Sequence, residues 1–132
     1  MATQLELLPK KLKELGYNSY KDYLKSEHWI NLRKRFYNSK KVKRIKEVYN
    51  KVLCEFCYGY ENLNLHHRTY KRIGCERLDD LVIVCKECHY HIHQFYYKNM
   101  NIKNLYRATR IMRRIKRRYR KRSKNDNGQK LK

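Results

Sequence analysis

The sequence predicts an α+β fold, with helices at both ends of the chain and a short pair of strands between them. Three observations predict it: apolar residues recur at helical spacing before residue 50, strand-like runs lie within residues 51–95, and helical spacing returns in residues 101–122. The 132 residues suit one domain. We expect a helical extension over residues 1–50, a core over 51–98, a basic helix over 99–122 and a disordered tail over 123–132.

The first 50 residues carry the signals of several helices. Pro9 can occupy the first turn of a helix and Gly16 can end it. Ser19 and Ser26 stand where N-caps of the next two helices are expected. Apolar residues at helical spacing predict the buried side of these helices: Leu8, Leu12, Leu15, Trp29, Leu32 and Phe36.

The middle of the chain changes to the pattern of strands. "NLNLHH" and "LVIVC" predict two strands, "RTYKRIGCERLDD" a basic loop between them, and "KECHYHIHQFYY" a helix after them. Further on, residues 101–122 are expected to form one long helix. Its apolar residues repeat at intervals of three and four: Leu105, Ala108, Ile111, Met112, Ile115 and Tyr119.

The charge of the chain indicates a polyanionic partner. Lys and Arg number 34 against 12 Asp and Glu, which gives a formal net charge of +22. Nucleic acid is the first choice and an anionic membrane surface the weaker one. No run approaches the roughly 20 apolar residues of a membrane-spanning helix. Because the first residues show no signal-peptide pattern, we expect a reducing cytosol, where paired cysteines indicate metal ligands before disulfides.

Four of the five cysteines fall into two C-x-x-C pairs. Cys54 and Cys57 form the first pair, and Cys85 and Cys88 form the second, with 27 residues between the pairs. Each C-x-x-C turn can present two thiolates to one ion, so the pairs predict a structural four-cysteine zinc site. Redox chemistry at one pair and buried free thiols are the alternatives. Cys75 has no partner by spacing.

If the cysteines hold a zinc ion, the clustered histidines are available for another role. His89 and His93 are four residues apart on the expected helix, so they share a face and can bind one metal. His91 lies about 200° around that helix from His89 and is not expected to join them. His66 and His67 point to opposite faces of a strand, so one can be a third ligand and the other a general base. The alternative is that these histidines only pack around the zinc or contact phosphates.

Together these residues resemble the HNH endonucleases, whose active site is a ββα-metal unit. Residues 54–93 carry the resemblance: Cys54-x2-Cys57, then "LHHRTY", then "DDLVIVCKECHYHIH". The upstream "YLKSEHWINLRKRF" is similar to the helical lead-in of many phage and bacterial members. The resemblance implies a ββα-metal core, a zinc ion on the four cysteines, and a chain from a phage or mobile element that acts in the bacterial or infected-host cytoplasm.

The resemblance also implies roles for single residues. His67 matches the general base that activates water, and His66 the metal ligand before it. His89 and His93 match the ligands on the helix, for a catalytic Mg²⁺, Mn²⁺, Ni²⁺ or Zn²⁺. Asp80 is a departure, because it stands directly before Leu81, where the family usually has an asparagine. An aspartate there could orient His67 or bind a hard cation. The implied reaction is phosphodiester hydrolysis.

Basic residues near this unit indicate contacts with the nucleic acid backbone. Arg68, Lys71 and Arg72 follow the expected base and could hold the scissile phosphate or its neighbours. Ten of the 16 residues from Arg107 to Arg122 are Arg or Lys. That density predicts backbone tracking along DNA by a set that includes Arg110, Arg113, Arg114, Lys116 and Arg117. A solvated charged face is the alternative.

The motifs and the resemblance therefore predict a metal-dependent HNH DNA endonuclease. The competing hypothesis is a non-catalytic, zinc-stapled nucleic-acid-binding module, and RNA stays open as the partner. A single active site nicks one strand, so a double-strand break would need a homodimer, a partner subunit or two sequential nicks.

Overall fold

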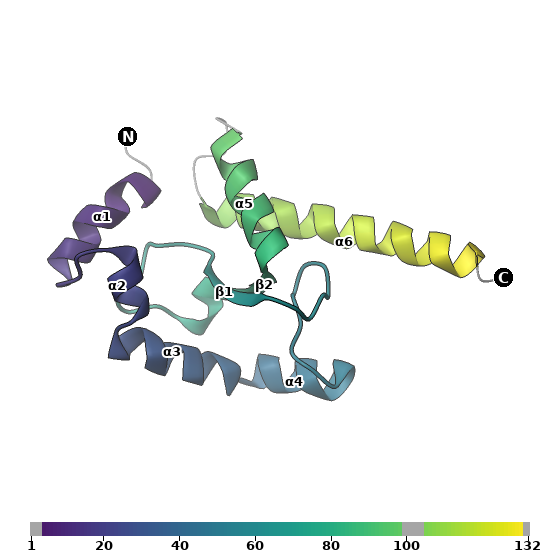
Figure 1. The fold of residues 1–132 in the computed structure, drawn as a ribbon, viewed down its shortest axis with the longest axis horizontal. Helices are drawn as coiled ribbons and strands as arrows, with labels where there is room; N and C mark the ends of the chain where they lie inside the picture. Colours follow the sequence, from purple (N-terminus) through teal and green to yellow (C-terminus); the bar gives the residue numbers. More distant parts are fainter. Residues whose placement is uncertain (1–3, 99–104, 131–132) are drawn as a thin grey trace. The chain divides into compact units, whose positions relative to one another are not determined.

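The computed structural model describes residues 4–98 and 105–130, and the side chains of residues 6–98 and 105–118 (Figure 1). It confirms the predicted α+β class, with helices before and after a two-stranded sheet. The elements follow in the order α1 (Gln4–Glu14), α2 (Tyr20–Leu24), α3 (Glu27–Tyr37), α4 (Lys40–Tyr49), β1 (Leu63–His67), the 3-10 turn η1 (Leu78–Asp80), β2 (Leu81–Cys85), α5 (Lys86–Lys98) and α6 (Leu105–Lys130).

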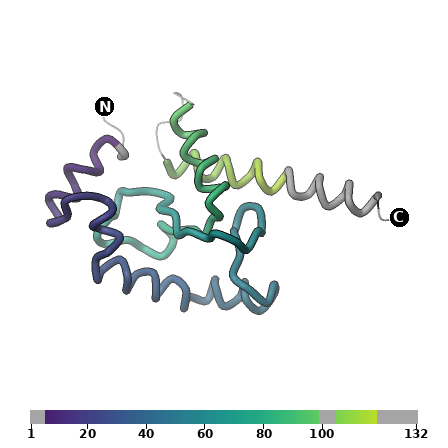
Figure 2. Tube along the Cα trace, viewed as in Figure 1, coloured from purple at the N-terminus to yellow at the C-terminus, as the bar shows by residue number. Residues whose placement is uncertain are grey.

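The chain divides into two compact units, and the division passes through both strands. The first unit comprises Met1–Val52 and Leu65–Val82, and the second comprises Leu53–Asn64 and Ile83–Lys132. Figure 2 traces the chain through both, from the purple N-terminal helices to the yellow-green α6. The division from sequence into an extension, a core and a basic helix stays a prediction.

The two strands form an antiparallel hairpin whose register follows from its outermost backbone bonds. Arg68 N donates to Asp80 O at 2.7 Å in the first unit, and Lys86 N donates to Asn62 O at 2.9 Å in the second. This register places His66 opposite Val82 and His67 opposite Leu81. The first four residues of β2 are buried, which agrees with its continuous apolar sequence.

Serine caps and one glycine set the helix ends in the first unit. Ser19 Oγ accepts from Asp22 N and Ser26 Oγ accepts from Trp29 N, both at 3.1 Å, as predicted. Gly16 follows α1 with φ +94°, a conformation that side chains disfavour. The prediction for Pro9 is wrong, because α1 begins at Gln4 and Pro9 lies inside it. The Leu-rich and Glu-containing residues before Pro9 are good helix formers, and they extend the helix backward.

The predicted apolar side of the N-terminal helices largely forms the core of the first unit. Leu8, Leu12, Trp29, Leu32 and Phe36 are buried together with Tyr23 and Val42. Leu15 differs, since it is 44% exposed. Its side chain covers Gly74, where an added Cβ would lie 2.9 Å from Leu15 Cδ1.

In the second unit, α5 and α6 pack against each other through a small apolar set. Ile92 and Tyr96 of α5 are buried, as are Leu105, Ala108 and Met112 of α6. Ile115 is 46% exposed, so the predicted apolar stripe ends before it, and the side chain of Tyr119 lies outside the described ones.

Helix α6 covers a different range from the predicted one. It runs to Lys130, which places most of the predicted disordered tail in a helix. Adding a residue to a formed helix costs far less than nucleating one, and the tail contains no proline. Residues 101–104, the first of the predicted helix, lie outside the described residues. No described helix is long and apolar enough to cross a membrane.

Candidate metal centre and buried histidine network

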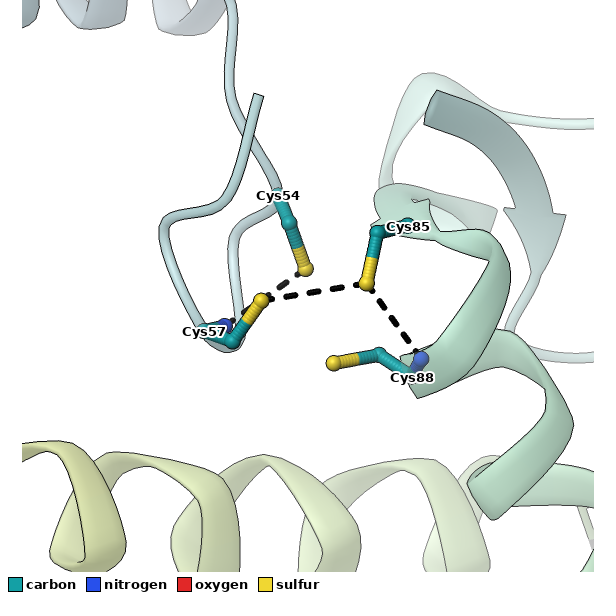
Figure 3. A group of neighbouring side chains, drawn as sticks. All are labelled: Cys54, Cys57, Cys85 and Cys88. Atoms are coloured by element: carbon teal, nitrogen blue, oxygen red, sulfur yellow. Dashed lines mark hydrogen bonds between the residues drawn. The ribbon is translucent and has the colours of Figure 1, made fainter. Parts of the chain in front are cut away.

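Four cysteine side chains come together in the second unit. The sulfur atoms of Cys54, Cys57, Cys85 and Cys88 all lie within 4.8 Å of one another. Figure 3 shows the four side chains with their sulfurs pointing toward one another: Cys54 and Cys57 come from the loop before β1, Cys85 from the end of β2 and Cys88 from the first turn of α5. The prediction that the two C-x-x-C pairs share one site is confirmed, while Cys75 is exposed and outside the cluster.

The distances in this cluster fit a tetrahedral zinc ion. Sγ of Cys57 and Sγ of Cys85 are 3.7 Å apart. Two thiolates on one zinc ion, each at about 2.3 Å, would be about 3.8 Å apart. A disulfide would need about 2.05 Å, and all five cysteines are free.

The first cysteine pair lies on a tight turn that directs backbone donors at sulfur. Tyr58 N donates to Cys54 O at 3.0 Å, and Tyr58 itself has a positive φ of 64°. The backbone N–H groups of Phe56 and Cys57 point at Sγ of Cys54, at 3.4 and 3.5 Å. At the second pair, Cys88 N approaches Sγ of Cys85 at 3.3 Å. Such donors favour thiolates, the form that binds metal.

The pKa shifts of two cysteines inside the cluster also favour metal binding. The hydrogen bond from the Cys88 thiol holds the pKa of Cys54 well below its usual range. The same hydrogen bond, together with burial, raises the pKa of Cys88. The first proton therefore leaves Cys54 easily, and a cation is needed to offset the repulsion among further thiolates.

Glu55 is a buried carboxylate that holds this turn on β2. Its Oε2 accepts from Ile83 N at 2.7 Å, and its own N–H donates to Ile83 O at 2.9 Å. No sequence pattern predicts this role, since a glutamate between two cysteines is ordinarily solvated. The contact fixes the first cysteine pair relative to the strand that carries the second.

The two predicted helix ligands lie one turn apart on α5 and face each other. Nε2 of His89 and Nε2 of His93 are 3.1 Å apart. Two imidazole nitrogens at about 2.0–2.1 Å from one ion would be about 3.3 Å apart, so the pair fits a shared metal. Burial lowers the pKa of His93, which favours the neutral form that ligates metal. His91 is directed elsewhere, as predicted, with its Nδ1 2.6 Å from Nζ of Lys116.

The histidine pair on β1 divides between the two faces of the strand. Both side chains are buried. The imidazole of His67 stacks on Trp29 in the first unit, with ring centroids 4.9 Å apart. His66, the neighbouring residue, is therefore directed to the opposite face of the strand.

Both ring nitrogens of His67 have hydrogen-bond partners. Nε2 lies 2.8 Å from Oε2 of Glu76, and Nδ1 lies 2.9 Å from the hydroxyl of Tyr20. Because a carboxylate only accepts, Nε2 carries the proton, and in the neutral ring Nδ1 accepts from Tyr20. Neither nitrogen faces water in this arrangement.

Glu76 is the centre of this network and was missed by the sequence analysis. Its carboxylate accepts from the Tyr23 hydroxyl, from His28 Nε2 at 2.9 Å, from His67 Nε2 at 2.8 Å and from Gly74 N at 2.8 Å. Burial alone would raise the pKa of Glu76, but the hydrogen bonds from His67, Tyr23 and His28 outweigh it and lower the pKa to about 2. No sequence spacing predicts a partnership among residues so far apart in the chain.

Asp80 braces the loop between the strands. It accepts from Nε of Arg72 at 2.8 Å, from Nη2 of the same residue, and from Arg77 N at 2.9 Å. Burial raises the pKa of Asp80, but the Arg72 hydrogen bond outweighs it and the net shift is downward. The carboxylate that orients His67 is thus Glu76, while Asp80 holds Arg72.

The predicted phosphate-binding residues lie in different settings. The Arg72 guanidinium is engaged by Asp80, and Nη1 of Arg68 donates to Asp79 O at 3.3 Å. Lys71 is exposed. On α6, Arg110, Arg114 and Arg117 are exposed, and Arg113 and Lys116 are half-buried.

No protein-family model, curated protein or solved structure significantly matches this chain. What the residues themselves establish is a four-cysteine cluster with a β-hairpin followed by a helix, consistent with a zinc-binding ββα unit.

Proposed function

We propose that this protein is a metal-dependent endonuclease of the HNH type, which hydrolyses phosphodiester bonds in DNA. The observation that carries the proposal is the pair His89 and His93, 3.1 Å apart on the helix that starts within the four-cysteine cluster. The four cysteines would hold a zinc ion at the start of this helix, and the two histidines would then be available for a second ion.

His66 is the proposed third ligand of the second ion. Its strand directs it away from the face that His67 occupies, and its imidazole is the same kind of ligand as those of His89 and His93. Three protein ligands leave a coordination position open to substrate, which is typical of catalytic sites. A divalent ion there would stabilise the negative charge that develops on the phosphate oxygens during hydrolysis.

The general-base role of His67 stays a prediction, with a new requirement. Its imidazole is buried, and its nitrogens are held by Glu76 and Tyr20. Proton transfer from water requires that Tyr20 release Nδ1, while Glu76 keeps the proton on Nε2 and stabilises the imidazolium that forms. We propose that substrate binding opens this contact.

DNA is the proposed partner because the chain carries a net charge of +22 and a basic α6. The exposed Arg110, Arg114 and Arg117 would follow the phosphate backbone, which supplies affinity with little sequence information. Arg72, held by Asp80, is pre-organised for one phosphate rather than mobile.

The test is cleavage of supercoiled plasmid with Mg²⁺, Mn²⁺, Ni²⁺ or Zn²⁺. We expect the wild type to nick the plasmid and the variant His89→Ala/His93→Ala to lose at least about 100-fold in rate while still binding DNA. His91→Ala is the matched control, because it changes the same helix on another face and should keep the activity. A wild type that nicks with none of these metals would refute the proposal.

The burial of His67 favours a second candidate, a zinc-stapled nucleic-acid-binding module without catalysis. In that case the His67–Glu76 contact only stabilises the first unit. This candidate predicts DNA or RNA binding that survives loss of the histidine pair and no nicking under any metal.

A further inference from the structure

The strongest charge concentration in the first unit lies where α3 meets α4. Residues 33–46 contain eight Lys and Arg and no Asp or Glu. The segment is about a tenth of the chain and carries eight of its 22 net positive charges. All eight side chains are exposed: Arg33, Lys34, Arg35, Lys40, Lys41, Lys43, Arg44 and Lys46. We call these eight residues the α3–α4 basic surface.

The packing of the two helices holds this surface in place. Leu32, Phe36 and Val42 are buried and anchor both helices in the core of the first unit. Only Asn38 and Ser39 separate α3 from α4, and Ser39 caps α4 through Val42 N. The charges therefore stand on two anchored helices rather than on a freely moving tail.

A cavity on α3 lies beside two of these basic side chains. Ile30, Arg33, Lys34, Tyr37 and Asn38 line a cavity of about 370 Å³. Two cations, a phenol and an amide supply hydrogen-bond donors for phosphate, and the ring and Ile30 supply apolar contact for a sugar.

The start of α4 is electrostatically unfavourable without an anion. Its first turn contains no acidic residue and carries Lys40 and Lys41. Cations at the positive end of a helix dipole are destabilising, and a bound phosphate would reverse the sign of that interaction.

We infer that the α3–α4 basic surface binds the phosphate backbone of duplex DNA, as a contact separate from α6. The exposed apolar side chains of α3 and α4, namely Ile30, Val48 and Tyr49, lie outside residues 33–46, so the basic surface itself lacks the exposed apolar face that a helix lying on a membrane needs. At about 1.5 Å per helical residue, the helical parts of this segment, residues 33–37 on α3 and 40–46 on α4, are about 8 Å and about 10 Å long, enough together to meet several phosphates of one strand. The inference shares its DNA partner with the proposed function but requires neither the metal nor cleavage.

The experiment measures the affinity for a fluorescent 25-base-pair duplex by anisotropy over a range of salt concentrations. The His89→Ala background prevents cleavage in every protein that is compared. The test variant carries Lys40→Gln, Lys41→Gln, Lys43→Gln and Arg44→Gln. The matched control carries Lys10→Gln, Lys13→Gln, Lys21→Gln and Lys25→Gln, which removes four exposed charges from the same unit. Circular dichroism and the melting temperature check that both variants fold.

We expect the test variant to bind at least about tenfold more weakly at moderate salt, and the control to change less than about twofold. The slope of log K against log salt should become shallower by up to about 3.6 in the test variant, about 0.9 for each of the four removed cations. Equal weakening in both variants would mean that net charge alone acts, and the inference would be overturned. Unchanged binding in the test variant would overturn it as well.

Two further measurements distinguish other partners from duplex DNA, and a third outcome distinguishes this inference from the proposed function. If the test variant loses binding to vesicles with anionic lipid but keeps DNA affinity, the surface is a membrane contact and the inference fails. If single-stranded RNA competes at least tenfold better than duplex DNA through these four residues, RNA replaces DNA. If the wild type binds duplex DNA through this surface but never nicks plasmid, the proposed nuclease function is refuted and the inference about the surface is not.

Discussion

Glu76 Oε2 lies 2.8 Å from His67 Nε2, and neither side chain is exposed to solvent. The two residues lie nine positions apart on either side of a turn, and they join a strand to the N-terminal helices through Tyr23, His28 and Tyr20. A buried ionised carboxylate is tolerated only with donors on its oxygens, and Glu76 has four.

Replacing Glu76 should destabilise the first unit strongly. Glu76→Gln removes the charge and presents an amide N–H to donors, so we expect a loss of about 3 kcal/mol in the free energy of unfolding, measured by urea denaturation. Glu47→Gln, an exposed change on α4, is the control and should cost less than about 0.5 kcal/mol. A loss in Glu76→Gln no larger than in the control would contradict the network.

Stability should fall in acid because of the same residue. The pKa of Glu76 is lowered from 4.5 to about 2 in the folded protein. The unfolded state therefore binds the proton more tightly, so this contribution is complete above pH 4.5 and is lost as the pH falls toward 2. Its size is up to about 3 kcal/mol. Urea midpoints between pH 6 and pH 2.5 should show a steeper decline in the wild type than in Glu76→Gln, and parallel curves would contradict the assignment.

Loss of the metal should unfold the second unit. Cys75, which is exposed and outside the cluster, should play no part in metal binding. After dialysis, elemental analysis should find one tightly held zinc ion per chain in the wild type. The variant Cys57→Ser/Cys85→Ser should hold no zinc at this site, because only two of the four thiolates remain. The helical circular dichroism signal should fall with the zinc, because α5 starts within the cluster. Cys75→Ser is the control. Retention of one equivalent of zinc by the double variant would place the metal elsewhere.

Removing the Tyr20 hydroxyl should lower the stability of the first unit and make His67 more accessible to water. Tyr20→Phe leaves Nδ1 of His67 without its donor, at a cost of about 1–3 kcal/mol. If substrate must open this contact, as proposed, plasmid nicking should rise in Tyr20→Phe at a temperature where the variant is folded. Tyr90→Phe, at a tyrosine that is 61% exposed, is the control for both measurements. A stable Tyr20→Phe protein with an unchanged or lower nicking rate would contradict the opening step.

Local patterns predicted most of the elements, and nonlocal contacts account for what was missed. The caps at Ser19 and Ser26, the hairpin, and the pairing of His89 with His93 depend on residues three to five positions apart or on strand alternation. Glu76 gains its role from Tyr23, His28 and His67, which are distant in sequence, and Glu55 gains its role from Ile83. Sequence spacing cannot show such contacts, because the fold brings the partners together. Pro9 was misplaced because favourable helix formers before it outweighed the boundary signal.

The position of the second cysteine pair has a consequence for the order of assembly. Cys85 is the last residue of β2 and Cys88 lies in the first turn of α5. An ion that binds both would fix the dihedral angles of the first helical turn, which is the step that isolated helices find most costly. Metal loading would then act as the nucleus for α5, and the His89–His93 pair would become aligned only afterward. With both proposed sites filled, a newly made chain would thus bind zinc on the thiolates first and the histidine-bound ion second.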